Sequence, residues 1–196
     1  MLSVFSSNLS EKMLLFHRHY KKSMEKIDQS GGKPERVSRV ILTTATPEDL
    51  DLVVEWESKE KNVVPWSKDK HMSMLEDPSS LYFMVNKKST EEPIPVGYSI
   101  LKKDSPDSSS VEFIRLVISD EYKSRGYGVW AFEDIWDKVF NQLNYEGIWH
   151  DVFVENHIAI SLYDRLGYKK FGEGIDPITG RGLILYEMTK DDYLSR

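Results

Sequence analysis

The chain has 196 residues, of which 40% are hydrophobic and 30% charged, and its formal net charge is -6 at pH 7. This composition is typical of a single globular domain with an apolar core. The negative balance argues against a general nucleic-acid partner, because phosphate backbones require clustered positive charge. The chain has no cysteine, which excludes disulfides and thiolate zinc sites, and the sequence predicts no metal site.

Residues 1–38 differ from the rest of the chain. In "NLSEKMLLFHRHYKKSMEKIDQS" apolar residues recur at helical spacing, which predicts an amphipathic helix that ends at "SGGKP". We expect this extension to pack on the domain of residues 39–196 or on a second copy of the chain, so a homodimer is an open alternative. As a lesser alternative, the start of this extension is an organellar transit peptide. No apolar run approaches the roughly 20 residues of a membrane span, and a cytoplasmic location is expected.

Strand-like and helix-like patterns alternate from residue 39 onward. Thr46 and Pro47 indicate a helix start, and the mostly apolar segment 110–119 is expected to be a central strand. The charged segment 56–71 predicts a solvated helix end and loop, with an amine pocket as the lesser alternative. Strands are predicted at 39–45, 80–88, 95–103, 110–119, 147–154 and 182–189, and helices at 46–60, 129–140 and 157–167.

The stretch "KSRGYG", residues 123–128, lies between a predicted strand and a predicted helix. Loop amides and a helix N-terminus direct unpaired N–H donors at one point, which suits a phosphate. Gly126 and Gly128 remove Cβ atoms where a diphosphate would approach, and Lys123 and Arg125 add positive charge. A bare Gly-x-Gly is also compatible with an ordinary turn. The Gly-Lys-Ser/Thr of a P-loop is absent.

A second motif follows in "NHIAISLYDRLGY", residues 156–168. Asn156 follows a predicted strand and is suited either to cap the next helix or to hold a ligand amide. Ala159 and Tyr163 lie four residues apart, on one face of that helix. Gly167 is expected to end it.

These two motifs, in this order, resemble those of the GNAT superfamily of N-acetyltransferases. "KSRGYG" is similar to the family's Arg/Gln-x-x-Gly-x-Gly/Ala, with Lys123 where Arg or Gln is usual, and "NHIAISLYDRLGY" is similar to its Asn-x-x-Ala-x-x-x-Tyr followed by Gly-Phe/Tyr. The resemblance is strongest over residues 111–173, and within it "FIRLVIS…GYG…HDVFVEN", residues 113–156, looks most like the branch that includes ribosomal-protein N-terminal acetyltransferases and enzymes for small amines. The resemblance implies an α/β (α+β) fold with a mixed, mostly antiparallel central sheet, flanked by helices and splayed at the central strands.

The resemblance also implies the reaction and its residues. Acetyl-CoA would donate its acetyl group directly to a primary amine, either a small molecule or a protein N-terminus, with Tyr163 as the general acid. The implied donor-binding residues are Leu116, Val117 and Ile118 for pantetheine, and Lys123, Ser124, Arg125, Gly126, Tyr127 and Gly128 for the diphosphate, together with Asn156 and Ala159.

The general base is argued from the residues themselves. Glu112 lies in the apolar strand 110–119, where a carboxylate is costly unless it is functional or ion-paired, and both alternatives stay open. Strict alternation predicts Glu112, Ile114 and Leu116 on one face and Phe113 and Arg115 on the other. His150, Asp151 and Glu155 are weaker candidates, since a lone histidine in an apolar strand is usually structural.

Two other classes of function compete with the enzyme. One is a non-catalytic acyl-CoA sensor or interaction protein, against which the presence of Tyr163 argues. The other is a nucleoside-triphosphate binder, against which the missing P-loop pair argues.

Overall fold

The computed structural model describes residues 38–103, 105 and 107–196. The N-terminal extension predicted for residues 1–38 therefore lies, apart from Ser38, outside the described residues. None of the described helices is long and apolar enough to cross a bilayer.

Seven strands form one sheet in the order β1-β2-β3-β4-β5-β7-β6. All neighbouring strands in it are antiparallel except β4 and β5, which are parallel. The predicted mixed, mostly antiparallel sheet is thus confirmed. The strands are β1 Val40–Thr44, β2 Ser80–Lys87, β3 Ile94–Lys103, β4 Ser110–Ile118, β5 Gly147–Phe153, β6 Lys169–Ile175 and β7 Gly182–Thr189.

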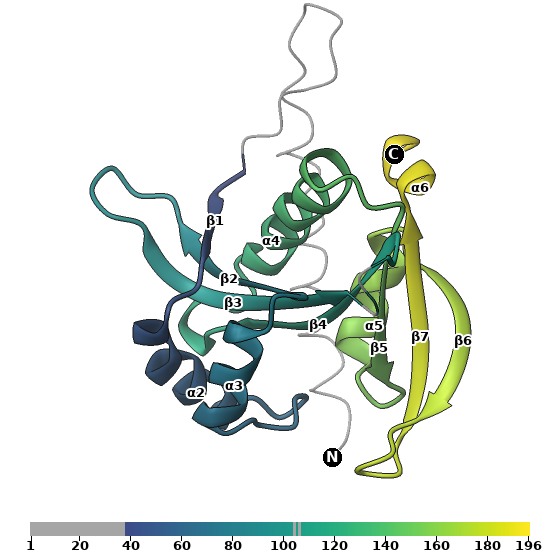
Figure 1. The fold of residues 1–196 in the computed structure, drawn as a ribbon, viewed down its shortest axis with the longest axis horizontal. Coiled ribbons are helices and arrows are strands. Elements are labelled where there is room, and N and C mark those ends of the chain that lie inside the picture. Colours follow the sequence, from purple (N-terminus) through teal and green to yellow (C-terminus); the bar gives the residue numbers. More distant parts are fainter. Residues whose placement is uncertain (1–37, 104, 106) are drawn as a thin grey trace, which may run out of the picture.

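Helices cover both faces of the sheet. Figure 1 shows α4 on one face and α2 and α3 on the other, with α5 beside β5. The α4 face buries Val129, Phe132, Ile135, Trp136, Val139 and Phe140, as the sequence predicted. The helices are α2 Leu50–Lys59, α3 Lys68–Glu76, α4 Tyr127–Trp136, α5 His157–Arg165 and α6 Lys190–Leu194, with short turns η1 Pro47–Asp49, η2 Asp120–Tyr122 and η3 Asp137–Gln142, the last of these a π-helical turn.

Local sequence explains where the first helical segment starts. Thr46 donates from its backbone N–H to Asp49 Oδ2 at 2.8 Å and from its hydroxyl at 3.0 Å, and Pro47 occupies the first turn. Thr46 stands at the N-cap position, as predicted, and Asp49 satisfies its backbone N–H, which a helix start leaves without an intrahelical partner.

A β-bulge in β4 overturns the predicted alternation of that strand. The pairing with β3 shifts so that Ile100 faces Arg115 while Leu101 faces Phe113, which leaves Ile114 as the extra residue. Phe113 and Leu116 consequently pack on the α4 side of the sheet. Ile114 and Arg115 both lie on the side of α2 and α3. The prediction that Ile114 and Leu116 share a face was therefore wrong.

Candidate functional site

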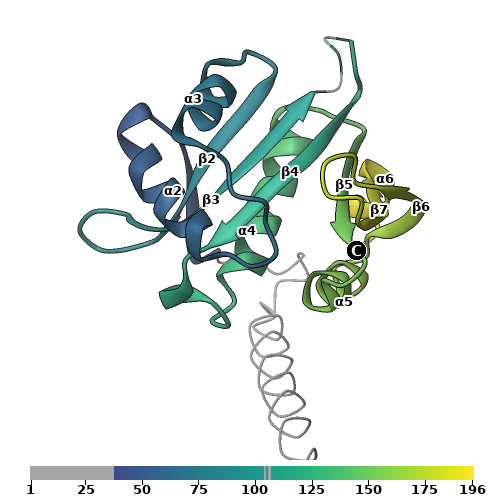
Figure 2. The ribbon, with the colours of Figure 1, turned by 90° about the horizontal axis from the view of Figure 1, so that it is seen from below.

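Strands β4 and β5 pair with each other only at their beginnings. Residues 110–112 pair with residues 147–149, and beyond this point β4 continues to Ile118 and β5 to Phe153 without pairing to each other. Figure 2 shows the two strands diverging. The β4 backbone from Phe113 to Ile118, which includes Leu116 and Val117, therefore has no strand partner on this side and can pair with an extended ligand.

The loop that follows β4 presents free backbone donors at the N-terminus of α4. Gly126 has φ of +90° and Ser124 has φ of +59°, so the chain turns through the left-handed region twice. The amides of residues 124–128 donate to no other described residue, whereas the Lys123 amide donates to the Ser119 carbonyl at 3.2 Å. Free amides beside the positive end of a ten-residue helix form a site suited to an anion.

Gly128 is not required by the packing of the protein itself. A Cβ at this position would meet a single described atom within 4 Å, Cγ1 of Ile118 at 3.9 Å. Because the fold leaves this space open, a ligand can approach the Gly128 backbone closely. Gly126 differs, because its positive φ strains any other residue.

The two basic residues of the loop, Lys123 and Arg125, differ in whether they form ion pairs. Lys123 donates to Glu60 and to Asp120, each at 2.7 Å. Arg125 is exposed and forms no ion pair with a described residue, and its guanidinium lies 5.7 Å from the ring centroid of Tyr122. Of the two basic residues, Arg125 is therefore the one whose charge is not already paired with a described carboxylate and can interact with an anion.

The second motif forms the start of α5 beside the open strands. Asn156 Oδ1 accepts from the Ala159 amide at 3.2 Å, so this side chain caps the helix, one of its two predicted roles. Ala159 and Leu162 pack against the core under α4. The cap and these contacts fix the direction in which α5 presents Tyr163.

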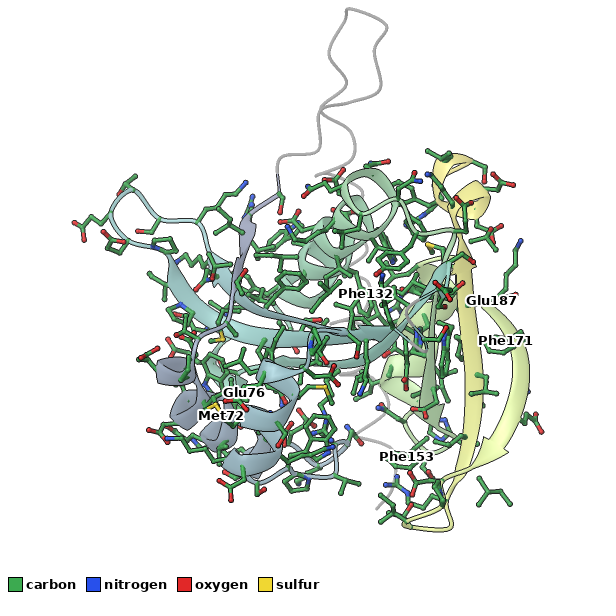
Figure 3. The ribbon with its side chains drawn as sticks, viewed as in Figure 1. Met72, Glu76, Phe132, Phe153, Phe171 and Glu187 are labelled. Atoms are coloured by element: carbon green, nitrogen blue, oxygen red, sulfur yellow. The ribbon has the colours of Figure 1, made fainter. Side chains whose placement is uncertain are left out.

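Tyr163 lies in a cluster of aromatic rings. Its ring centroid is 4.0 Å from that of His150 and 5.8 Å from that of Phe132, whose central position is labelled in Figure 3. Its hydroxyl makes no hydrogen bond to a described residue. Burial, together with the charge of Asp151, raises the pKa of Tyr163 above its ordinary value, so the phenol is protonated at neutral pH.

The opposite face of β5 carries carboxylates. Ile148, His150 and Val152 point into the core, so Trp149 and Asp151 point to the side of α2 and α3. Glu112 of β4, Trp149 of β5 and Glu187 of β7 are in register and form one row across the sheet. Lysines flank this row on β3 and β6, and both are ion-paired with aspartates outside it: Lys102 with Asp77, and Lys169 with Asp192. Desolvation and the charge of Asp176 raise the pKa of Asp151.

This row borders an open cavity of about 540 Å³. Trp149, Phe171, Leu185 and Glu187 line it, and Figure 3 shows Phe171 and Glu187 on the β6–β7 side of the molecule. Another cavity, of about 400 Å³, lies beside α4 and away from the open strands, so it plays no part in this site.

The other weaker base candidates are placed differently. His150 is 1% exposed on the core face, and burial lowers its pKa to about 3. Glu155 pairs with Arg181 at 3.2 Å, and its pKa is lowered. Asp151 is exposed on the same face as Glu112 and has a raised pKa, whereas neither His150 nor Glu155 has both properties.

A buried polar network behind the site was not anticipated from the sequence. Glu57, which is 0% exposed, accepts hydrogen bonds from Tyr98 and Arg115 and, at 2.6 Å, from the Trp66 amide. His71 Nε2 lies 3.4 Å from Glu57 Oε2. Arg115 reaches across to the Val64 carbonyl at 2.8 Å, so these groups fix the segment after α2 onto β4.

This network corrects the prediction for residues 56–71. Glu57 is neither solvated nor free to bind an amine, and residues from 68 onward form α3 rather than a loop. A pattern signal existed in the recurrence of Leu50, Val53 and Glu57 along one face of α2, but a carboxylate at a core position is not recognisable without its partners.

An open sheet of this topology, with free amides at the end of the open strand and a tyrosine beside it, defines the class of N-acyltransferases. The model of the Acetyltransferase (GNAT) family matches residues 49–168. The chain belongs to this family and is an acetyltransferase. The resemblance recognised from "KSRGYG" and "NHIAISLYDRLGY" is confirmed.

Solved structures share the fold. A chimeric spermidine N-acetyltransferase SpeG from Vibrio cholerae and hSSAT aligns with a TM-score of 0.69 at 23% identity, covering 81% of this chain and 100% of that one. SpeG from Vibrio cholerae in complex with manganese ions gives 0.66 at 20% identity, covering 81% and 97%. A dodecameric spermidine N-acetyltransferase from Vibrio cholerae gives 0.66 at 20%, covering 81% and 98%. No curated protein matches the chain in sequence.

Proposed function

We propose that the protein transfers the acetyl group of acetyl-CoA to the primary amine of a small cationic acceptor. The observation that carries this proposal is the open β4–β5 pair, which leads to five free amides at the start of α4. Pantetheine pairs with the unpartnered backbone of residues 116–118, and the diphosphate binds the amides of residues 124–128. Arg125 supplies positive charge, and Gly128 leaves room for the diphosphate.

The acceptor approaches the carboxylate-bearing face of β4, β5 and β7. The row of Glu112, Trp149 and Glu187 favours an alkylammonium group, because carboxylates and an aromatic face both attract cations. The solved structures of this fold named above act on spermidine, which agrees with a small aliphatic amine. We assign a small aliphatic amine as the acceptor of this chain because its own face of β4, β5 and β7 carries carboxylates and an aromatic ring.

Asp151 takes the proton from the ammonium group, directly or through a water molecule. It is exposed, faces the acceptor and has a raised pKa, which makes it a stronger base than an ordinary aspartate. Glu112, the base predicted from the sequence, stands at the last β4–β5 pair and holds the cation electrostatically in this proposal.

The neutral amine then attacks the thioester carbonyl carbon and forms a tetrahedral intermediate. As the C–S bond breaks, the thiolate of CoA leaves and takes the hydroxyl proton of Tyr163. The nitrogen of the product still carries one excess proton and passes it to the phenolate, directly or through a water molecule, which restores Tyr163 and leaves the neutral amide. The hydroxyl has no competing hydrogen bond to a described residue. Because its pKa exceeds that of a thiol, this proton transfer depends on positioning and on stabilisation of the phenolate.

The test is a calorimetric titration with acetyl-CoA, followed by an acetylation screen of diamines, polyamines and peptides with free N-termini. We expect micromolar binding that Gly128→Glu abolishes and Gly128→Ala reduces only partly, because the longer carboxylate occupies the phosphate position. Unlike a substitution at Gly126, neither variant meets a strained φ. Retained binding in Gly128→Glu, or acetylation of none of the amines, would contradict the proposal.

A further inference from the structure

The imidazole of His150 is a buried polar group without a polar partner. Its side chain is 1% exposed, and neither Nδ1 nor Nε2 makes a hydrogen bond to a described residue. Leaving a buried donor or acceptor unsatisfied costs about 1–3 kcal/mol. A leucine or phenylalanine would fill a purely structural position on β5 without this cost. The imidazole is therefore the feature of this core that packing does not explain.

Four aromatic rings surround His150. Their centroids lie 4.0 Å away for Tyr163, 4.6 Å for Tyr168, and 5.8 Å for both Phe113 and Tyr186. These rings come from β4, α5, β7 and the turn before β6, so four separate segments each present an aromatic side chain to the imidazole. The nearest of them belongs to the residue that we propose as the general acid.

The hydroxyls of this shell are engaged elsewhere, except that of Tyr163. The Tyr168 hydroxyl accepts from Trp136 Nε1 at 2.8 Å. The Tyr186 hydroxyl donates to Asp164 Oδ1 at 2.9 Å. An unengaged imidazole N–H and an unengaged phenol thus belong to adjacent rings of the same cluster.

We propose that His150 is a positioning residue for Tyr163: the neutral imidazole orients the phenol ring and stabilises, through its N–H dipole, the phenolate that remains after Tyr163 has given up its proton. No proton leaves His150 in this step. The Tyr163 O–H bond breaks, the proton joins the leaving thiolate sulfur, and the negative charge stays on the phenolate, whose ring centroid lies 4.0 Å from that of the imidazole. This inference rests on the role of Tyr163 in the proposed function.

The surroundings give this interaction its strength. His150 is 1% exposed, so its dipole is shielded from water. A fixed dipole that is shielded from water acts on a nearby charge more strongly than it would in water. His150 stays neutral, because burial lowers its pKa to about 3. Asp151, adjacent along β5, raises the pKa of Tyr163 and so opposes phenolate formation, and the Asp164 carboxylate is occupied by Tyr186. His150 is thus a neutral donor, adjacent to Tyr163, that offsets the Asp151 charge.

The experiment measures the acidity of the residue 163 phenol directly. We would replace Tyr163 by 2,3,5-trifluorotyrosine, whose fluorine atoms are small and whose phenol ionises several pH units below that of tyrosine, and follow its ionisation by fluorine NMR. His150→Phe keeps a packed ring and removes the N–H, whereas His150→Gln restores a donor. We expect the midpoint to rise by about one pH unit in His150→Phe and to return towards the wild-type value in His150→Gln.

Two results would overturn the inference: an unchanged midpoint in His150→Phe, or equal rises in His150→Phe and His150→Gln. If the phenylalanine variant fails to fold, the nitrogen-15 shifts of His150 in the otherwise unsubstituted chain give a second measurement. They should move when the fluorinated phenol ionises, and constant shifts would reject the interaction.

Kinetics separate this inference from the proposed function. We expect His150→Phe to lower kcat about tenfold and to leave the Kd for acetyl-CoA unchanged. The NMR titration needs no acceptor, so it remains informative if no amine is acetylated. If no amine is acetylated but His150→Phe shifts the midpoint of the NMR titration, the proposed acceptor is rejected. If an amine is acetylated but the midpoint does not shift, only the role of His150 is rejected.

Discussion

Lys123 and Glu60, which are 63 positions apart, form an ion pair of 2.7 Å that joins the loop after β4 to the segment after α2. The Glu60 side chain is only 14% exposed, so solvent screens this contact less than a fully exposed pair. A diphosphate bound to the loop attracts the same ammonium group. Binding of the donor is therefore coupled to the contacts of residues 60–67.

Removal of the Glu60 carboxylate, which competes with the diphosphate for Lys123, should strengthen the binding of CoA. We expect Glu60→Gln to lower the Kd for CoA about two- to fivefold, as measured by calorimetry, because Lys123 no longer has to leave this partner. Glu121→Gln is the matched control: it removes the same charge from the same loop, at an exposed residue that forms no ion pair with the described residues. Equal effects of the two variants would mean that the ion pair does not compete with CoA.

The hydroxyl of Tyr163 should matter for turnover and not for donor binding. Tyr163→Phe is expected to lower kcat about tenfold or more with an unchanged Kd for acetyl-CoA, because the ring still packs against His150 and Phe132 while the proton is lost. Tyr186→Phe, in the same ring cluster but bonded to Asp164, should leave kcat nearly unchanged. Unaltered turnover in Tyr163→Phe would remove this residue from the mechanism.

Asp151 should determine the acidic limb of the pH–rate profile. Its ionised form is the base, so activity falls as the pH drops through its pKa, and this fall begins at a higher pH than for an ordinary aspartate. Asp151→Asn is expected to lower kcat about 100-fold and to abolish the limb. Asp176→Asn removes the neighbouring charge that raises the pKa, and should move the limb to lower pH. Glu155→Gln serves as the control, and a limb unaffected by Asp151→Asn would assign it to another group.

Glu57 should stabilise the fold at neutral pH and lose this effect in acid. Desolvation opposes its ionisation, but the close approach of His71, the hydrogen bonds from Tyr98 and the Trp66 amide, and the charge of Arg115 lower its pKa overall. A lowered folded-state pKa gives stability that is present above the unfolded-state pKa and is lost as the pH falls through the folded-state value.

Chemical denaturation tests this expectation. Glu57→Gln should reduce the free energy of unfolding by about 3–5 kcal/mol at pH 7, because Arg115 then keeps no charged partner at this position. The difference in the free energy of unfolding between Glu57→Gln and wild type should become smaller as the pH falls below the ordinary pKa range of a glutamate. The exposed Glu55, paired with Lys59, gives the control, since Glu55→Gln should change stability by less than about 0.5 kcal/mol. A constant difference at all pH values would contradict the titration of Glu57.

The sequence was sufficient to predict the motifs and most of the elements. Regular apolar spacing predicted α4 and α5, and the order of a strand, two glycines and a helix predicted the loop around Gly126. The cap formed by Asn156 was one of the two roles predicted for it, because such a side chain acts on amides close by in the chain. Such local relationships are visible in a sequence because they join residues a few positions apart.

Long-range relationships were not predictable in this way. The ion pair of Lys123 with Glu60 and the hydrogen bond of Arg115 with Glu57 join residues more than 50 positions apart. The strand β6 was missed because "KKFGEGI" is polar and contains two glycines, so only its pairing with β7 defines it as a strand. The role of Asp151 depends on Asp176, whose place in the β6–β7 hairpin no short pattern indicates.

The extra residue in β4 decides which face of the sheet Arg115 occupies. If β4 kept Ile114 but were pleated regularly from Phe113 onward, the guanidinium of Arg115 would enter the apolar layer under α4, and Leu116 would turn towards Glu57. Arg115 and Glu57 would then both be buried without their charged partner. Deletion of Ile114 would instead leave Arg115 and Leu116 on their present faces, so homologous chains with this polar network should either keep the bulge or lack one residue at this point of the strand.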